Sequence, residues 1–96
     1  MRKVIWSAEE VVSSRDIVVV VAVIDQWGVT VSEETGTSSQ QVTCNTDRMK
    51  EVLNVRTDAE LMDELERRFG SPCGYYNARM FMEENGIEFH WWGGSC

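Results

Sequence analysis

The sequence has few of the residues that build metal sites or disulfide frameworks. Its 96 residues include one histidine and three cysteines, and the cysteines stand far apart, at positions 44, 73 and 96. Structural zinc sites usually take paired ligands about two to four residues apart, because one tight turn then delivers both. An odd number of widely spaced cysteines also argues against a disulfide framework. We therefore expect reduced thiols, no metal or other cofactor, and a cytoplasmic protein.

Long hydrophobic runs are also absent. The longest run, IVVVVAVI, covers residues 17–24, whereas a transmembrane helix needs about 20 apolar residues. The N-terminal segment carries Arg2 and Lys3, but Ser7 and Glu9 interrupt its apolar stretch at once, which is unlike a secretory signal. The sequence thus predicts neither a membrane partner nor export.

Positive charge is scarce. Nine Lys and Arg residues stand against sixteen Asp and Glu residues, which gives a net charge of −7 and a pI near 4.6. No basic run is longer than two residues, and phosphate binding needs clustered Lys and Arg to displace counterions. We therefore expect no direct binding of nucleic acid. An acidic surface instead suits a basic partner, or serves solubility.

What is present is the composition of an ordinary folded domain, with 43% hydrophobic and 26% charged residues. The length is close to the commonest domain size, so we expect one domain over residues 1–96. In the first half, valines dominate residues 17–24 on both faces, which predicts a central strand. Residues 26–28 are expected to turn the chain, and residues 27–34 then alternate, with Trp27 on the apolar side of a half-buried strand. Shorter strands are expected over 3–6 and 40–44.

The second half has helical spacing. Thr57-x-x-Glu60 is a capping box that opens a helix, and Pro72 is expected at the first position of the next one, which would place Cys73 in its first turn. The expected helices and final strand cover 47–55, 58–69, 72–85 and 87–92. The sequence therefore predicts an α+β fold, in which an antiparallel sheet of about four to five strands carries two to three helices mainly on one face.

The only histidine lies in the segment EFHWW, residues 88–92. In an extended strand, alternate residues point to opposite sides. The apolar set, expected on the core, is Ile87, Phe89 and Trp91. The outward set is Glu88, His90 and Trp92. The pattern thus favours a partly exposed histidine on a strand over a catalytic one.

Two chemical alternatives use the cysteines. His90 with Cys44, Cys73 and Cys96 would make a Cys₃His zinc site, but the spacing is wrong for paired ligands. Cys73 near a helix start could form a reactive thiolate paired with His90, as in a thiol-dependent enzyme or redox protein. No orienting group or oxyanion turn accompanies that pair. We therefore assign no catalytic residue and no metal ligand.

Three features are candidates for partner binding. The first is an acidic stretch without a base, which consists of Asp58, Glu60, Asp63, Glu64 and Glu66; Arg67 and Arg68 follow four residues after its third and fourth members. The second is a pair of apolar residues, Tyr76 and Met80, opposite the apolar face of the third helix. The third is Trp92, on the polar side of its strand. Ordinary explanations are a solvated helix face, a helix packed on both sides, and a terminal ring folded over the sheet.

These observations lead to a functional hypothesis. We expect a small acidic protein–protein interaction module, acting as an inhibitor that occupies a basic, nucleic-acid-binding surface on a larger protein or nucleoprotein. In being short, acidic and free of motifs, the chain resembles in general character the small phage-borne inhibitors of host defence, anti-CRISPR proteins among them. The alternatives are the thiol chemistry of Cys73 and His90, and a homo-oligomer such as a homodimer, in which an open sheet edge and Trp92 meet a second copy.

Overall fold

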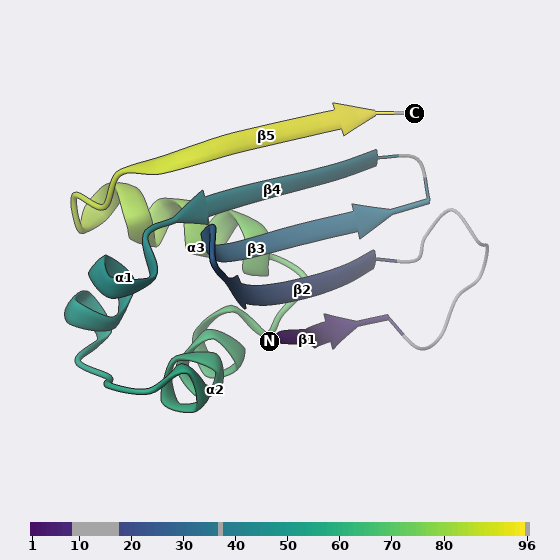
Figure 1. Ribbon diagram of the computed structural model, residues 1–96. Coiled ribbons are helices and arrows are strands. Elements are labelled where there is room, and N and C mark those ends of the chain that lie inside the picture. Colours follow the sequence, from purple (N-terminus) through teal and green to yellow (C-terminus); the bar gives the residue numbers. More distant parts are fainter. Residues whose placement is uncertain (9–17, 37, 96) are drawn as a thin grey trace.

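The computed structural model describes residues 1–8, 18–36 and 38–95, and the side chains up to residue 93 (Figure 1). Cys96, one of the four residues weighed above as zinc ligands, therefore lies outside the described residues. The strands are β1 (Arg2–Ser7), β2 (Val18–Asp25), β3 (Gly28–Thr35), β4 (Ser38–Cys44) and β5 (Phe89–Ser95). The helices are α1 (Thr46–Leu53), α2 (Asp58–Phe69) and α3 (Gly74–Glu84).

The five strands form one antiparallel sheet in the order β1-β2-β3-β4-β5. The chain leaves the sheet after β4, forms the three helices, and returns as β5 beside β4 (Figure 1). The predicted α+β class is thus confirmed, as are the strand and helix numbers. The sequence left the place of the last strand open, and the structure puts it at the sheet edge opposite β1.

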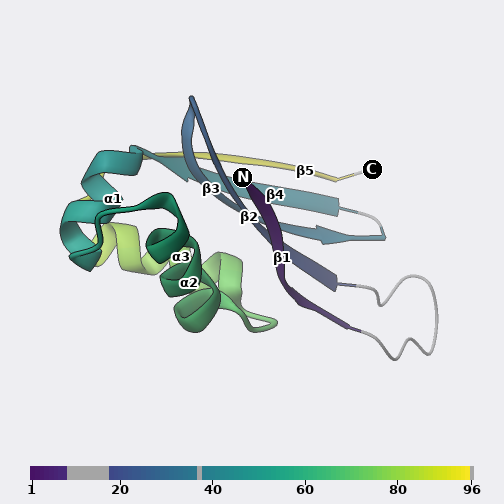
Figure 2. The ribbon, with the colours of Figure 1, turned by 60° about the horizontal axis from the view of Figure 1, so that its bottom comes forward.

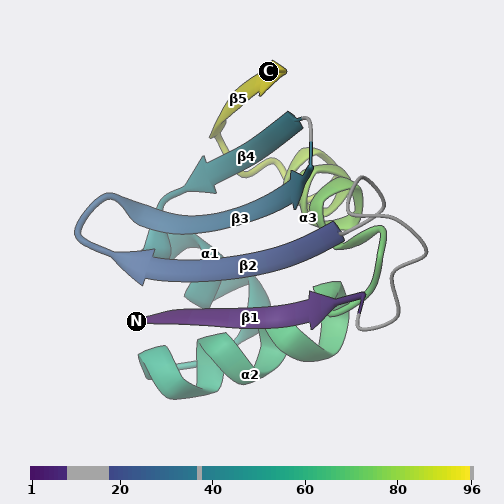
Figure 3. The same ribbon diagram turned by 90° about the vertical axis from the view of Figure 1, so that its right-hand side faces the viewer.

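All three helices lie on one side of the sheet (Figures 2 and 3). Helix α2 packs against β1 and β2, and α3 packs against β3 and β4. The core between the layers joins the inward valines of the sheet to the apolar stripes of the helices, with Tyr75, Leu61, Leu65, Met49 and Met82 fully buried. No helix that the structure describes has the length and apolar character needed to cross a membrane.

Local sequence explains where the first two helices begin. The Asn45 side chain accepts a hydrogen bond from the backbone N–H of Arg48 at 2.9 Å and caps α1. Thr57 caps α2 by accepting from the N–H of Glu60 at 3.1 Å, and its hydroxyl donates to the Glu60 carboxylate at 3.1 Å. The Thr57 half of the predicted capping box is therefore present, while the Glu60 carboxylate bonds to the Thr57 hydroxyl and not to its backbone N–H.

The third helix begins later than predicted. Its first residue is Gly74, and Cys73 is its N-cap residue without a side-chain capping bond. Residues 71–73 form a turn, in which the N–H of Gly74 donates to the Ser71 carbonyl at 2.9 Å. Pro72 therefore precedes the helix instead of occupying its first position, and Cys73 is not in the first helical turn.

The β2–β3 connection is a tight turn at residues 26–27. The Asp25 carboxylate accepts a hydrogen bond from the N–H of Trp27 at 2.8 Å. Gly28 has a φ of +129°, and a Cβ added there would lie 2.1 Å from the carbonyl oxygen of Cys44. Only glycine allows this close approach of the turn to the end of β4.

Candidate functional site

One face of the sheet carries no helix among the described residues (Figure 2). The strand register places the side chains of this open face in cross-strand rows. One row is Val4, Val21, Ser32, Gln41 and Trp92. The next row is Arg2, Val23, Thr30, Thr43 and His90. The open face thus changes from valines and Arg2 on β1 and β2 to hydroxyl and amide side chains in the middle and to aromatic rings at β5.

Trp27 is the most exposed of the large hydrophobic residues described, at 77%. The sequence pattern placed it on the apolar side of a strand with Val29, and this prediction was wrong. Strand β3 begins at Gly28, so Trp27 belongs to the turn. Its side chain therefore does not pack in the core. Three neighbouring depressions of about 300 Å³ each share Trp27 in their lining. One of them is lined by Val23, Thr30 and Thr43, which places the Trp27 ring beside the open face.

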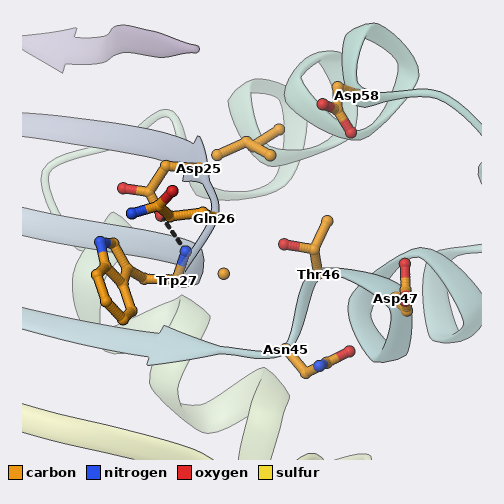
Figure 4. A pocket seen from close by; sticks show the side chains of 9 residues that line it. Asp25, Gln26, Trp27, Asn45, Thr46, Asp47 and Asp58 are labelled. Atoms are coloured by element: carbon orange, nitrogen blue, oxygen red, sulfur yellow. Dashed lines mark hydrogen bonds between the residues drawn. The ribbon is translucent and has the colours of Figure 1, made fainter.

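Each of the three depressions that Trp27 lines is also lined by at least one carboxylate. Figure 4 shows the depression between the turn and the starts of α1 and α2, with Asp25, Asp47 and Asp58 in its lining. Glu88 borders the adjacent depression together with His90. Asp58 forms an ion pair with Lys50 at 2.7 Å. Asp25, Asp47 and Glu88 have no ion pair with any residue that the structure describes. We call Asp25, Trp27, Asp47 and Glu88 the Trp27 surface.

The five carboxylates predicted as partner-binding on α2 are in part engaged within the molecule. Besides the Asp58 pair, Glu64 bonds to Arg67 and Arg68 at 2.5 and 2.9 Å, and these guanidinium groups hold its pKa below the ordinary value. Glu66 pairs with Lys3, and this hydrogen bond raises the pKa of that ammonium group. Such exposed pairs contribute little stability, but each one offsets a negative charge. Glu60 and Asp63 have no ion pair within the described residues; Arg67 bonds to Glu64 rather than to Asp63.

The three predicted apolar anchors do not share one surface. Tyr76 and Met80 are 51% and 55% exposed on the outer side of α3. The Tyr76 hydroxyl accepts a 3.4 Å hydrogen bond from Gln40, whereas Met80 borders a shallow groove of about 340 Å³ between α2 and α3. Trp92, 58% exposed, projects from the opposite side of the sheet. The sequence identified these exposed residues but could not show that the sheet separates them.

The Trp91 side chain was expected in the core and is instead 51% exposed. It lies on the helix side of β5, opposite Val42. Helix α3 covers β3 and β4, so β5 lies beyond the cover that buries Val42. The Arg79 guanidinium stacks over the Trp91 ring at 5.1 Å. The alternation of β5 therefore predicted the correct side of the sheet for Trp91. Its exposure results from the position of β5 at the sheet edge.

Of the two cysteines that the structure describes, Cys44 lines the same depression as His90, whereas Cys73 lies apart from it. Thr43, the cross-strand neighbour of His90, is on the open face. Cys73 is the N-cap residue of α3, which packs on the covered side of the sheet, so the sheet lies between Cys73 and His90. Cys44 is buried, and burial raises the pKa of its thiol to about 11. No group of three or more His, Cys, Asp or Glu side chains in the described part of the chain is arranged to hold a metal ion.

Comparison with protein families, with curated proteins and with solved structures gives no match to this chain. Its function is therefore argued from the geometry of its own surfaces.

Proposed function

We propose that the protein is a small acidic interaction module that binds a basic surface of a larger protein or nucleoprotein through its Trp27 surface. The observation that carries this proposal is an exposed tryptophan ring on a hairpin turn, next to depressions lined by Asp25, Asp47 and Glu88, which have no ion pair within the described residues. The Asp25 carboxylate accepts a hydrogen bond from the Trp27 backbone N–H, which fixes the turn that carries the ring.

This arrangement suits Lys and Arg side chains. A guanidinium or ammonium group over a tryptophan face gains cation–π attraction, and flanking carboxylates add charge-assisted hydrogen bonds. Tryptophan is also among the residues that most often dominate the binding energy of protein interfaces. The net charge of −7 adds a long-range field that attracts a basic partner.

Such binding would make the protein an inhibitor where the basic surface normally holds nucleic acid. Carboxylates and phosphates compete for the same Lys and Arg groups, so occupation by one excludes the other. The unpaired carboxylates on α2, Glu60 and Asp63, extend the negative field beyond the Trp27 surface. The general resemblance to phage-borne inhibitors of host defence is compatible with this mode of action.

The first test removes the ring. Trp27→Ala is expected to weaken binding to an arginine- and lysine-rich peptide by about tenfold or more. Tryptophans that become buried in an interface often contribute most of its binding energy. Trp92→Ala, which removes an equally large exposed ring from β5, is the matched control and should bind as the parent does. Isothermal titration calorimetry measures both. Equal loss in the two variants, or no loss in either, would contradict the proposal.

The second part of the test concerns charge. Combining Asp25→Asn, Asp47→Asn and Glu88→Gln should weaken binding at low salt and flatten its dependence on salt, because screened attraction is then lost. Asparagine at position 25 still accepts the hydrogen bond that closes the turn. The control combines Glu60→Gln with Asp63→Asn, which removes two unpaired carboxylates from α2 instead. If this control weakened binding more than the triple variant does, the partner would bind at α2 and not at the Trp27 surface.

A further inference from the structure

The outer edge of β5 has no pairing partner among the described residues. Strand β5 pairs with β4 alone, over residues 89–95 (Figure 1). In an antiparallel pair every second residue directs its N–H and C=O groups away from the neighbour. The free side of β5 therefore presents a row of backbone donors and acceptors to a further strand.

The other edge of the sheet, formed by β1, is protected against pairing with another chain. Strand β1 carries Arg2 and Lys3, its pairing shifts register between Val4 and Trp6, and α2 runs alongside it (Figure 3). Charge, irregular register and a covering helix are the usual means by which a sheet edge avoids pairing with another chain. The ion pair of Lys3 with Glu66 joins β1 to that helix.

Strand β5 has none of these protections. Its sequence FHWWGGS contains no proline and no Asp, Glu, Lys or Arg, and its pairing with β4 is regular from Phe89 to Ser95. Two half-exposed rings flank the free edge, Trp91 on the helix side and Trp92 on the open face. The Trp91 ring lies against Gly93, where an added Cβ would be 3.0 Å from it, and under Arg79, so it is already held in place.

We propose that the free edge of β5 binds the same edge of a second copy of this chain. A two-fold axis perpendicular to the sheet brings the two β5 strands together antiparallel and keeps both helical layers on one side. Facing residues in such a pair point to the same side. Trp91 therefore faces Phe89, Trp91 or Gly93 of the second copy, and Trp92 faces His90, Trp92 or Gly94. The result is a continuous sheet made from both copies.

The chemistry of the edge selects a second copy as its occupant. An uncharged strand offers nothing to attract the basic partner proposed above, whereas two identical uncharged edges complement each other without placing like charges together. The burial is modest. Each half-exposed tryptophan adds about 100 Å², so the rings of both copies add roughly 400 Å² to the strand contact. The rings alone supply well under the roughly 1,200 Å² that a stable specific interface buries, so we expect a weak, concentration-dependent dimer.

The net charge of the chain determines how dimerisation should depend on salt. Each copy carries −7, so the two copies repel each other over long range. Salt screens this repulsion and leaves the backbone pairing and apolar contact. Dimer formation should therefore strengthen as NaCl rises from about 50 to about 500 mM. Binding to a basic partner should weaken over the same range, so failure of one proposal is distinguishable from failure of the other.

Sedimentation velocity over a range of concentrations tests the proposal on the parent chain and on matched variants. Trp92→Lys should weaken dimerisation by about tenfold or more. It also reduces the net negative charge, which by itself would favour association, so a weakening must come from the edge. Val4→Lys makes the same charge change at an exposed residue of the same face on β1, and should not weaken the dimer. Circular dichroism confirms that both variants are folded.

Amide hydrogen exchange gives a readout that needs no variant. Raising the concentration of the parent chain should slow exchange at alternate residues of β5 and leave the exchange of β1 unchanged. A mass of one chain at every concentration in high salt would overturn the proposal. So would a dimer that Val4→Lys breaks and Trp92→Lys does not, because its contact would then lie at β1.

Discussion

Tyr75 has an unusual environment for a tyrosine. It is the largest fully buried side chain described, and its hydroxyl has no hydrogen-bond partner among the described residues. A buried hydroxyl without a partner loses its bonds to water and gains none in return. The ring itself packs in the core and against Tyr76 in an edge-to-face contact at 5.1 Å. The burial of the ring thus outweighs an unfavourable polar group.

Tyr75→Phe should therefore stabilise the protein. The variant keeps the ring and removes the unpaired hydroxyl, so we expect the free energy of unfolding in urea to rise by about 1 kcal/mol. Tyr76→Phe is the control, because its hydroxyl is exposed and makes one long bond to Gln40. That change should alter stability by less than about 0.5 kcal/mol. A loss of stability in Tyr75→Phe would mean that the hydroxyl has a partner.

Cys44 links stability to alkaline pH. Burial raises the pKa of its thiol from an ordinary 9 to about 11, so the folded state keeps the proton that the unfolded chain releases in this range. The contribution is complete below about pH 9 and is lost as pH rises toward 11, by roughly 2 kcal/mol at most.

Urea unfolding between pH 8 and pH 11 measures this effect. Cys44→Ala removes the titrating thiol and leaves the lysines, so its free energy of unfolding should fall less steeply over the range in which the pKa of the Cys44 thiol is raised. The comparison of slopes is independent of any constant loss of packing. Parallel curves for parent and variant would show that the thiol does not contribute.

Among the elements, α2 has the clearest local signal for its start. The Thr57 side chain satisfies the N–H of Glu60, one of the groups at a helix start that has no partner within the helix. Thr57→Ala should therefore lower the free energy of unfolding by about 1 kcal/mol. Thr57→Ser keeps the hydroxyl and should retain most of that stability. Urea denaturation compares them, and equal losses in both variants would assign the effect to the methyl group instead.

The elements also differ in how much of their packing the residue pattern predicts. The run of valines in β2 predicts an interior strand, and β2 does lie between β1 and β3. Alternation in β5 predicts the correct side of the sheet for Trp91 but not its exposure. The exposure depends on which strands α3 covers, and α3 packs on β3 and β4. Pro72 could start a helix as well as precede one, and the turn from Ser71 to Gly74 decided between the two.

At the scale of the whole molecule, the acidic charge acts on two surfaces in opposite ways. Bases that lie near α2 offset three of its five predicted contact carboxylates, while Asp25, Asp47 and Glu88 near Trp27 stay without an ion pair in the described structure. Attraction of a basic partner to the Trp27 surface should therefore weaken with salt. Self-association through the uncharged edge of β5 should strengthen with it. One salt titration of each equilibrium separates the two.

The sequence by itself determined the class of fold, the antiparallel strands, the start of α2 and the acidic character, because these follow from side-chain period, capping and composition. Tertiary structure alone decided which carboxylates are neutralised, that the Trp27 side chain is exposed, and that β5 ends the sheet. The physical reason is that ion pairing, exposure and edge position depend on neighbours distant along the chain. Local patterns specify which face a side chain takes, but not what covers it.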